Sequence, residues 1–146
     1  MTAATQMALA ADLSELTRLA DRIEEFCAAN EVPPAVAYQL TLAADELITN
    51  VISYGFPDGA PGLPISVSLS AGAPGRAEVS VVISDDGPAF DPFAEAPPPI
   101  LEGDIDDRPI GGLGVHLVRT MMDDVSYARE AGRNVVTLRK RITLAG

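Results

Sequence analysis

Two stretches of alternating apolar and polar residues constrain the fold of this chain most strongly. In residues 65–69 isoleucine, valine and leucine alternate with serine, and in residues 77–83 every second position is again apolar. A period of two places one set of side chains on the buried face of a sheet. Because residues 71–75 contain glycine and proline, the pattern predicts two antiparallel strands joined by a hairpin loop.

Helical periodicity before these strands indicates a second layer. Residues 12–29 repeat apolar side chains at a helical spacing with charged residues between them, which predicts a first amphipathic helix. Pro33 and Pro34 suit the first turn of a second helix, where a missing N–H is tolerated. We expect that helix to run to about Tyr54 and Gly55, where a loop rich in glycine and proline begins.

The C-terminal half of the chain predicts a lid, a helix and a closing hairpin. Residues 85–112 contain six of the twelve prolines and no sustained periodicity, so we expect a lid over residues 88–111. The patterns that follow predict a helix over residues 113–122 and two strands, 125–129 and 135–142, about a turn at residues 131–133. Together the elements predict an α+β fold of two layers in one domain, residues 1–146.

Charge and composition exclude several classes of protein. Ten basic residues against twenty-one acidic ones leave a formal net charge of −11, which repels nucleic acid, so we expect a protein partner. No run approaches the roughly 20 consecutive apolar residues that a membrane-spanning helix needs. The N-terminus lacks a secretion signal, and we expect a cytoplasmic protein whose single cysteine, Cys27, is a small buried hydrophobic residue.

The second helix carries a pair of polar residues that could form a site. Glu46 and Asn50 are four residues apart, so they lie on one face of the helix, one turn apart. Such a pair can simply belong to a solvated helix face. However, asparagine is unfavourable inside a helix, and Leu47 and Val51 beside the pair have core character, so a partly buried site is also consistent with the pattern.

A second candidate segment lies where an apolar strand ends. Asp85 follows the strand, and a carboxylate there can accept a hydrogen bond from an exocyclic amine, while Gly87 lets the backbone approach a flat ring. Strand ends are common places for ligands to meet a scaffold. The alternative is a purely structural turn in which Asp91 caps the next segment.

A third candidate segment is a cluster of glycines at the start of a helix. Gly111, Gly112 and Gly114 lie at the start of the helix pattern, and bare N–H groups at a helix N-terminus form an anion site suited to phosphates. The lone histidine, His116, falls inside this helix, where we expect a surface or packing role and not a catalytic one.

The order and spacing of these segments resemble a known family. Residues 45–55, 85–91 and 111–118 are similar to the three motifs of the ATP-binding group that includes gyrase, heat-shock chaperones, histidine kinases and mismatch-repair proteins. Within that group the chain resembles the bacterial anti-sigma-factor serine/threonine kinases. The resemblance implies the Bergerat ATP-binding fold, a mixed, mostly antiparallel sheet covered on one face by helices.

The resemblance also implies a role for each motif residue. It implies that Glu46 is the general base, that Asn50 ligates Mg²⁺, and that Asp85 accepts a hydrogen bond from the adenine amine of ATP. The remaining residues implied to bind the nucleotide are Gly87, Ala89, Gly112, Leu113 and Gly114. The chain departs from the family pattern at two positions: Ala89 stands where glycine is usual, and Tyr54 stands where the kinases often carry histidine.

Two functions from different classes fit this resemblance. In the first, the domain sequesters a sigma factor and, with ATP, phosphorylates a small anti-anti-sigma protein, whose phosphate then weakens its binding. In the second, the domain is a nucleotide-dependent binding module that regulates a protein partner without phosphate transfer. A hydrolytic motor is disfavoured because such proteins need further domains. The resemblance implies a homodimer, and the helix at residues 12–29 is the candidate interface.

Overall fold

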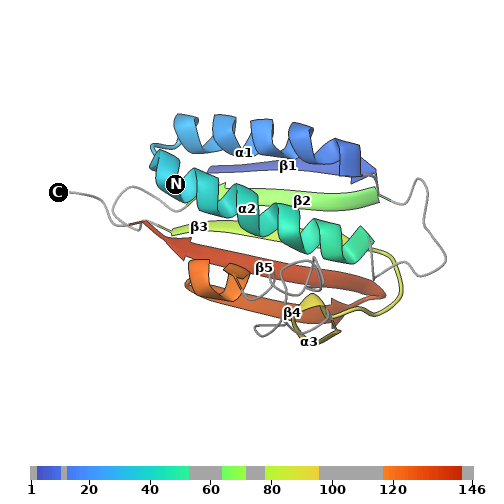
Figure 1. Ribbon diagram of the computed structural model, residues 1–146. Helices are drawn as coiled ribbons and strands as arrows, with labels where there is room; N and C mark the ends of the chain where they lie inside the picture. Colours follow the sequence, from blue (N-terminus) through green and yellow to red (C-terminus); the bar gives the residue numbers. More distant parts are fainter. Residues whose placement is uncertain (1–2, 11–12, 53–63, 72–77, 96–116, 143–146) are drawn as a thin grey trace, which may run out of the picture.

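The computed structural model describes residues 3–10, 13–52, 64–71, 78–95 and 117–142, and these form a five-stranded sheet with helices on one face (Figure 1). The strands are β1 (Ala3–Ala10), β2 (Pro64–Ala71), β3 (Glu78–Asp85), β4 (Asp124–Glu130) and β5 (Arg133–Arg141). Their order in the sheet is β1-β2-β3-β5-β4, and each neighbouring pair of these strands is antiparallel.

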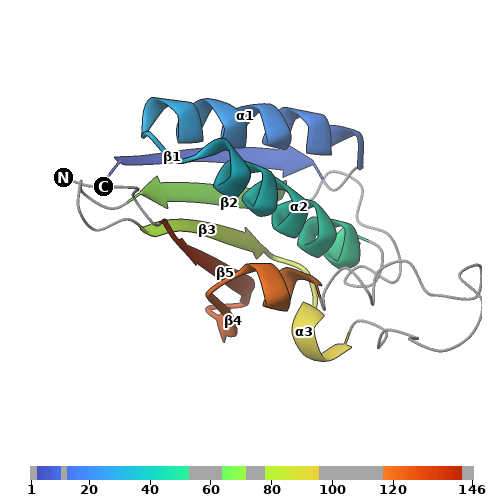
Figure 2. The ribbon, with the colours of Figure 1, turned by 60° about the vertical axis from the view of Figure 1, so that its left-hand side comes forward.

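The helices form the second layer. A 3-10 turn η1 (Leu13–Glu15) leads into α1 (Leu16–Ala29), which is followed by α2 (Pro34–Asn50); a short α3 (Pro92–Glu95) and a helical segment at residues 117–121 come later in the chain. Figure 2 shows α1 and α2 lying over the same face of the sheet. The predicted two-layer α+β class is confirmed.

The core lies between the two layers, as the alternating patterns predict. On β2 and β3, the residues at every second position are buried, among them Ile65, Val67, Val81 and Ile83. The inner face of α2 supplies apolar partners that are fully buried, including Leu40. Cys27 is also buried in this core, which confirms its expected place, and burial raises the pKa of its thiol to about 11.

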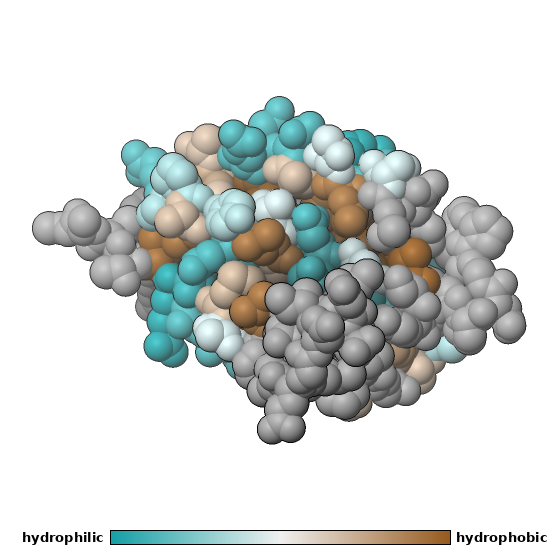
Figure 3. Space-filling view, in the orientation of Figure 1, coloured by the Kyte–Doolittle hydropathy of each residue, from teal (hydrophilic) through white to brown (hydrophobic). Residues whose placement is uncertain are grey.

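Hydrophilic and hydrophobic side chains are also separated on the surface of the molecule. On the helix-bearing side, hydrophilic side chains gather over α1, and more hydrophobic ones lie beside α2 (Figure 3). None of the helices in the described part of the chain is long and apolar enough to cross a membrane.

Most predicted elements agree with the structure within their described residues. The second helix begins at Pro34 as expected, and the closing hairpin turns at Ala131 and Gly132, which both adopt positive φ angles of the kind that two-residue hairpin turns require. Several predictions fall outside the described residues: the helix end at Tyr54 and Gly55, the loop at residues 72–75, and the part of the lid from residue 96 onward.

The N-terminal strand β1 is a structural element that the sequence patterns did not predict. Its residues are half alanine, which has a low preference for strands, and only Thr5, Met7 and Leu9 alternate toward the core. The strand forms because it pairs along its full length with β2, where Met7 lies opposite Val67.

Side chains of the first helix cover the free edge of β1. Arg22 Nη1 donates to the Thr5 hydroxyl oxygen at 3.1 Å and to the Gln6 carbonyl oxygen at 3.3 Å, and Arg18 Nη2 donates to the Ala8 carbonyl oxygen. Carbonyl groups on an edge strand would otherwise be open to pairing with another chain. The helix therefore both packs on the sheet and protects its edge.

We predict that Leu9→Ala lowers the free energy of unfolding by about 2–5 kcal/mol, because Leu9 is fully buried and its truncation leaves a cavity. Chemical denaturation measures the change. The matched control is Gln6→Ala on the same strand, where an exposed side chain is removed and a change within about 0.5 kcal/mol is expected. Equal effects of the two substitutions would contradict the packing of β1 against the core.

Candidate functional site

Asn50 is the last residue of α2, and its side chain is fully buried. Its amide nitrogen donates to the backbone carbonyl oxygen of Glu46 at 2.6 Å, which fixes the orientation of the amide group. The amide oxygen Oδ1 is buried and has no hydrogen-bond partner within the described residues. A buried acceptor without a partner costs free energy, so this atom is available to a ligand or a cation.

Two carboxyl groups of α2, those of Asp45 and Glu46, have raised pKa values. Burial raises the pKa of Glu46 above its ordinary value. Burial and, to a smaller extent, the neighbouring charge of Glu46 raise the pKa of Asp45 to about 6, and Asp45 Oδ1 is a buried acceptor without a partner in the described residues. A carboxylate with a raised pKa is the stronger proton acceptor, which suits Glu46 for general-base chemistry near neutral pH.

Asp85 is the last residue of β3, and it is almost completely buried. It continues the core-facing positions of Val81 and Ile83, so its carboxylate lies on the helix-bearing face of the sheet. Its Oδ1 atom accepts hydrogen bonds from the Gly87 backbone N–H at 2.9 Å and from Asn134 Nδ2 at 3.0 Å.

For the turn after β3 the sequence allowed either a ligand-binding carboxylate at Asp85 or a structural turn capped by Asp91, and the structure contains a buried Asp85 together with the cap. Asp91 Oδ1 accepts a hydrogen bond from the Phe93 backbone N–H at 2.9 Å, so Asp91 caps α3 as the turn interpretation expected. Asp85, in contrast, is a buried carboxylate at the end of a strand. Gly87 is buried and Ala89 is exposed.

Asn134 belongs to this group and was missed by the sequence interpretation. It lies on β5 directly opposite Asp85 in the strand register, and it is buried. The signal was present: Leu138 and Val136 face the core, and the same alternation continues to position 134, where a polar residue stands. A polar residue at a core-facing position of a strand end could have marked it as a candidate.

The structure describes two of the three predicted segments. Figures 1 and 2 show the C-terminal end of α2, with Glu46 and Asn50, and the C-terminal end of β3, with Asp85, at the same end of the molecule.

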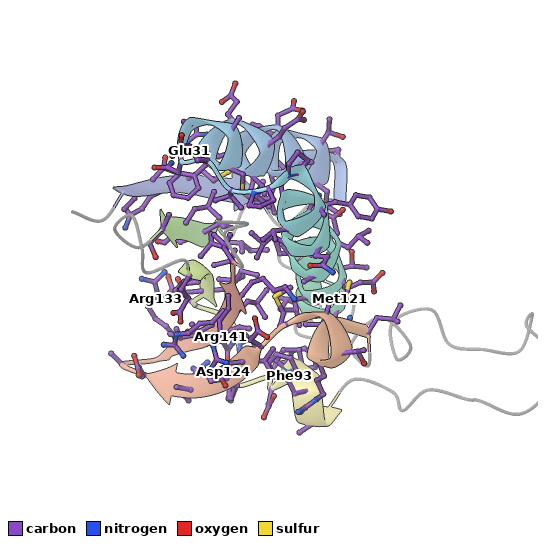
Figure 4. The ribbon with its side chains drawn as sticks, turned by 90° about the vertical axis from the view of Figure 1, so that its left-hand side faces the viewer. Glu31, Phe93, Met121, Asp124, Arg133 and Arg141 are labelled. Atoms are coloured by element: carbon purple, nitrogen blue, oxygen red, sulfur yellow. The ribbon has the colours of Figure 1, made fainter. Side chains whose placement is uncertain are left out.

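Figure 4 shows Phe93 of α3 beside the helical segment at residues 117–121, and the Arg119 guanidinium lies 4.9 Å from the centre of the Phe93 ring. That segment belongs to the core through Val118.

The third predicted segment lies outside the described residues. This applies to all of the glycine cluster and its neighbours, namely Gly111, Gly112, Leu113, Gly114 and His116. The predicted helix at residues 113–122 is seen from residue 117 to residue 121. The roles of the glycines therefore stay predictions.

The available donors define what the site could hold. In the described part of the chain, no group of three or more histidine, cysteine, aspartate or glutamate side chains could hold a metal ion. A divalent cation here would instead use an amide oxygen such as Asn50 Oδ1, with phosphate oxygens and water completing its shell, an arrangement that Mg²⁺ favours.

We predict that Asp45→Asn stabilises the protein at pH 7.5. Because the folded-state pKa of Asp45 is raised to about 6, the folded protein binds more protons than the unfolded chain between about pH 4 and pH 6, and its stability falls as the pH rises through that window. The gain from the substitution should therefore shrink as the pH is lowered from 7.5 to 4.5. Denaturation curves at several pH values measure this, with Asp21→Asn on the exposed side of α1 as the control. A gain that does not depend on pH would contradict the burial of this carboxyl group.

Comparison with known proteins finds a relative that is similar to most of this chain. The serine/threonine-protein kinase BtrW of Bordetella bronchiseptica is 40% identical over 101 residues, which make up 69% of this chain and 68% of that protein. The predicted enzyme class agrees with this relative, which is itself a serine/threonine-protein kinase.

Solved structures support the fold. The RsbU and RsbW domains of a Mycobacterium tuberculosis protein match with a TM-score of 0.66 and 14% identity, over 96% of this chain and 32% of that one. A blue-light activated histidine kinase of Erythrobacter litoralis matches with a TM-score of 0.53 and 20% identity, over 90% of this chain and 42% of that one. The chain thus spans less than half of either structure, and at these identities the likeness concerns the fold alone. Since the model of the histidine kinase-like ATPase domain matches residues 9–140, the chain belongs to the histidine kinase-like ATPase family.

Proposed function

We propose that this protein is an ATP-dependent serine/threonine kinase of the anti-sigma-factor type, which sequesters a sigma factor and phosphorylates a small anti-anti-sigma protein. The observation that carries the proposal is the unpartnered Oδ1 of Asn50, one helical turn from a carboxyl group with a raised pKa. Membership in the ATPase family and the likeness to BtrW support the use of ATP and the kinase class.

In this proposal the end of β3 recognises the base. Asp85 accepts a hydrogen bond from the exocyclic amine of adenine, and Gly87, which has no side chain, lets the flat ring approach the backbone closely. Ala89, two residues after Gly87 in the same turn, is also part of the proposed nucleotide-binding site. Gly112, Leu113 and Gly114 receive the phosphates at a helix N-terminus. They directly follow a lid formed by residues 88–111, within a domain that spans residues 1–146.

The end of α2 performs the chemistry. Asn50 Oδ1 would hold Mg²⁺, which when bound offsets the charge of the phosphate oxygens. Glu46 accepts the proton of the substrate hydroxyl while the hydroxyl oxygen attacks the γ-phosphorus. The bond between that phosphorus and the bridging β–γ oxygen breaks, so the products are a phosphorylated side chain and ADP.

The partners follow from charge and family resemblance. The net charge of −11 favours a basic protein surface over nucleic acid, which fits a role in the cytoplasm that acts on transcription through a sigma factor and not through DNA. Homodimerisation through the helix at residues 12–29 stays part of the proposal. The alternative function, a nucleotide-dependent binding module without phosphate transfer, gives a different result in the next experiment.

We predict that Glu46→Ala retains ATP binding and lowers phosphate transfer about a hundredfold or more. The substitution removes the proton acceptor and leaves Asp85, which recognises adenine, unchanged. Transfer of radiolabelled γ-phosphate to a co-purified anti-anti-sigma protein measures this. Glu24→Ala, which removes an exposed glutamate of α1, should transfer phosphate normally. If the wild-type protein binds ATP but transfers no phosphate, the binding-module function is correct.

We predict that Asp85→Asn weakens ATP binding by about 1–3 kcal/mol, roughly 5- to 150-fold, because the adenine amine loses a buried charged acceptor. Calorimetric titration measures the dissociation constant. Asp86→Asn is the matched control, since Asp86 is the next residue along the chain, exposed and paired with Arg133. Equal affinity of Asp85→Asn and the wild type would remove Asp85 from the site.

A further inference from the structure

The hairpin formed by β4 and β5 holds the turn that follows β3. Arg129 Nη1 donates to the Gly87 carbonyl oxygen at 2.8 Å. Arg133 Nη2 donates to Ser84 Oγ at 3.3 Å, and its Nε forms an ion pair with Asp86 Oδ1 at 2.9 Å. Side chains from a distant hairpin thus contact the turn on both sides of Asp85.

Asn134 lies at the centre of these contacts. Its Nδ2 donates to Asp85 Oδ1 at 3.0 Å and to the Pro88 carbonyl oxygen at 2.8 Å. Its Oδ1 accepts from the Phe90 backbone N–H at 3.0 Å and from the Tyr127 hydroxyl at 2.6 Å. A backbone N–H can only donate and a carbonyl can only accept, so these partners determine the orientation of the amide.

The side chain of Asn134 therefore uses two donor and two acceptor positions at once. Aspartate at this position would have no donor for Asp85 or Pro88, and alanine would offer nothing. Since the amide is buried, a replacement that lacks its donors or its acceptor leaves the corresponding partners without that hydrogen bond. The conformation of residues 85–90 therefore depends on an asparagine at position 134.

Within the described residues, the hydrogen bonds to the side chain of Asp85 both reach the same atom. Gly87 and Asn134 both donate to Oδ1, which fixes the rotation of the carboxylate and leaves Oδ2 as the oxygen that can meet a ligand. We propose that Asn134 is a positioning residue: it orients the Asp85 carboxylate toward the exocyclic amine of the purine, and Tyr127 holds Asn134 in place. This inference rests on the proposed function, in which Asp85 reads that amine.

The experiment compares two nucleotides, ATP and purine riboside triphosphate, which lacks only the amine. In Asn134→Asp the acceptor for Phe90 and Tyr127 stays, but the donor to Asp85 becomes a carboxylate oxygen, which repels the Asp85 carboxylate and turns it away. We expect the preference for ATP over purine riboside triphosphate to fall about tenfold, the size of one hydrogen bond to a charged group. Binding of purine riboside triphosphate should change less than about twofold, because it makes no use of the carboxylate.

A control separates positioning from general loss of stability. Asn30→Ala removes the hydrogen bond from Asn30 Nδ2 to the Phe26 carbonyl oxygen at the end of α1, away from the turn, and should leave the preference unchanged. Equal weakening of both nucleotides in Asn134→Asp would show a merely structural role and overturn the inference, as would an unchanged preference. A wild-type protein without preference for ATP would instead overturn the proposed contact of Asp85, and this inference with it.

A milder substitution covers the case in which Asn134→Asp does not fold. Tyr127→Phe removes the hydroxyl that donates to Asn134 Oδ1 and keeps the ring. We expect a two- to threefold fall in the preference for ATP, about the size of a weak neutral hydrogen bond. Tyr38→Phe, at an exposed tyrosine of α2, is the matched control and should show no fall. Identical preferences in the two phenylalanine variants would overturn the role of Tyr127 in holding Asn134.

Discussion

In the antiparallel register between β3 and β5, Asp85 lies directly opposite Asn134, and the hydrogen bond between their side chains joins residues 49 positions apart. The turn from Gly87 to Phe90 depends on this pair, since backbone groups of the turn form hydrogen bonds with the side chains of Asn134 and Arg129. Polar groups that are buried must be paired, and here the pairing itself defines the shape of the turn. The candidate base-recognition site thus depends on the register of a central strand pair.

The other half of the site is organised in the opposite way. Around the C-terminal end of α2, Asp45 Oδ1 and Asn50 Oδ1 are buried acceptors without partners in the described residues, and burial raises the pKa of Asp45 and Glu46. Groups held in this condition reduce stability, and functional sites commonly retain such groups because a ligand can satisfy them. The paired turn would hold the base firmly, whereas the unsatisfied helix end would be completed by the ligand.

The first helix, α1, stabilises the N-terminal edge of the sheet. It covers one side of the core with Leu19 and Ile23, and its arginines reach back to the carbonyl groups of β1. Its positive charges are therefore used within the molecule, at the edge of its own sheet. This arrangement leaves acidic residues to dominate the outer side of α1, in keeping with the net charge of the chain.

The sequence by itself determined the features that depend on local spacing. Period-two alternation predicted β2 and β3, helical periodicity predicted α1 and α2, and a spacing of four placed Glu46 and Asn50 one turn apart. The tertiary structure alone decided three features: β1, which is stabilised as a strand by β2 and α1; the burial that raises the pKa of Asp45; and the meeting of Asp85 with Asn134. Each of these depends on which distant residues become neighbours, and that is set by strand register and layer packing, which no local pattern encodes.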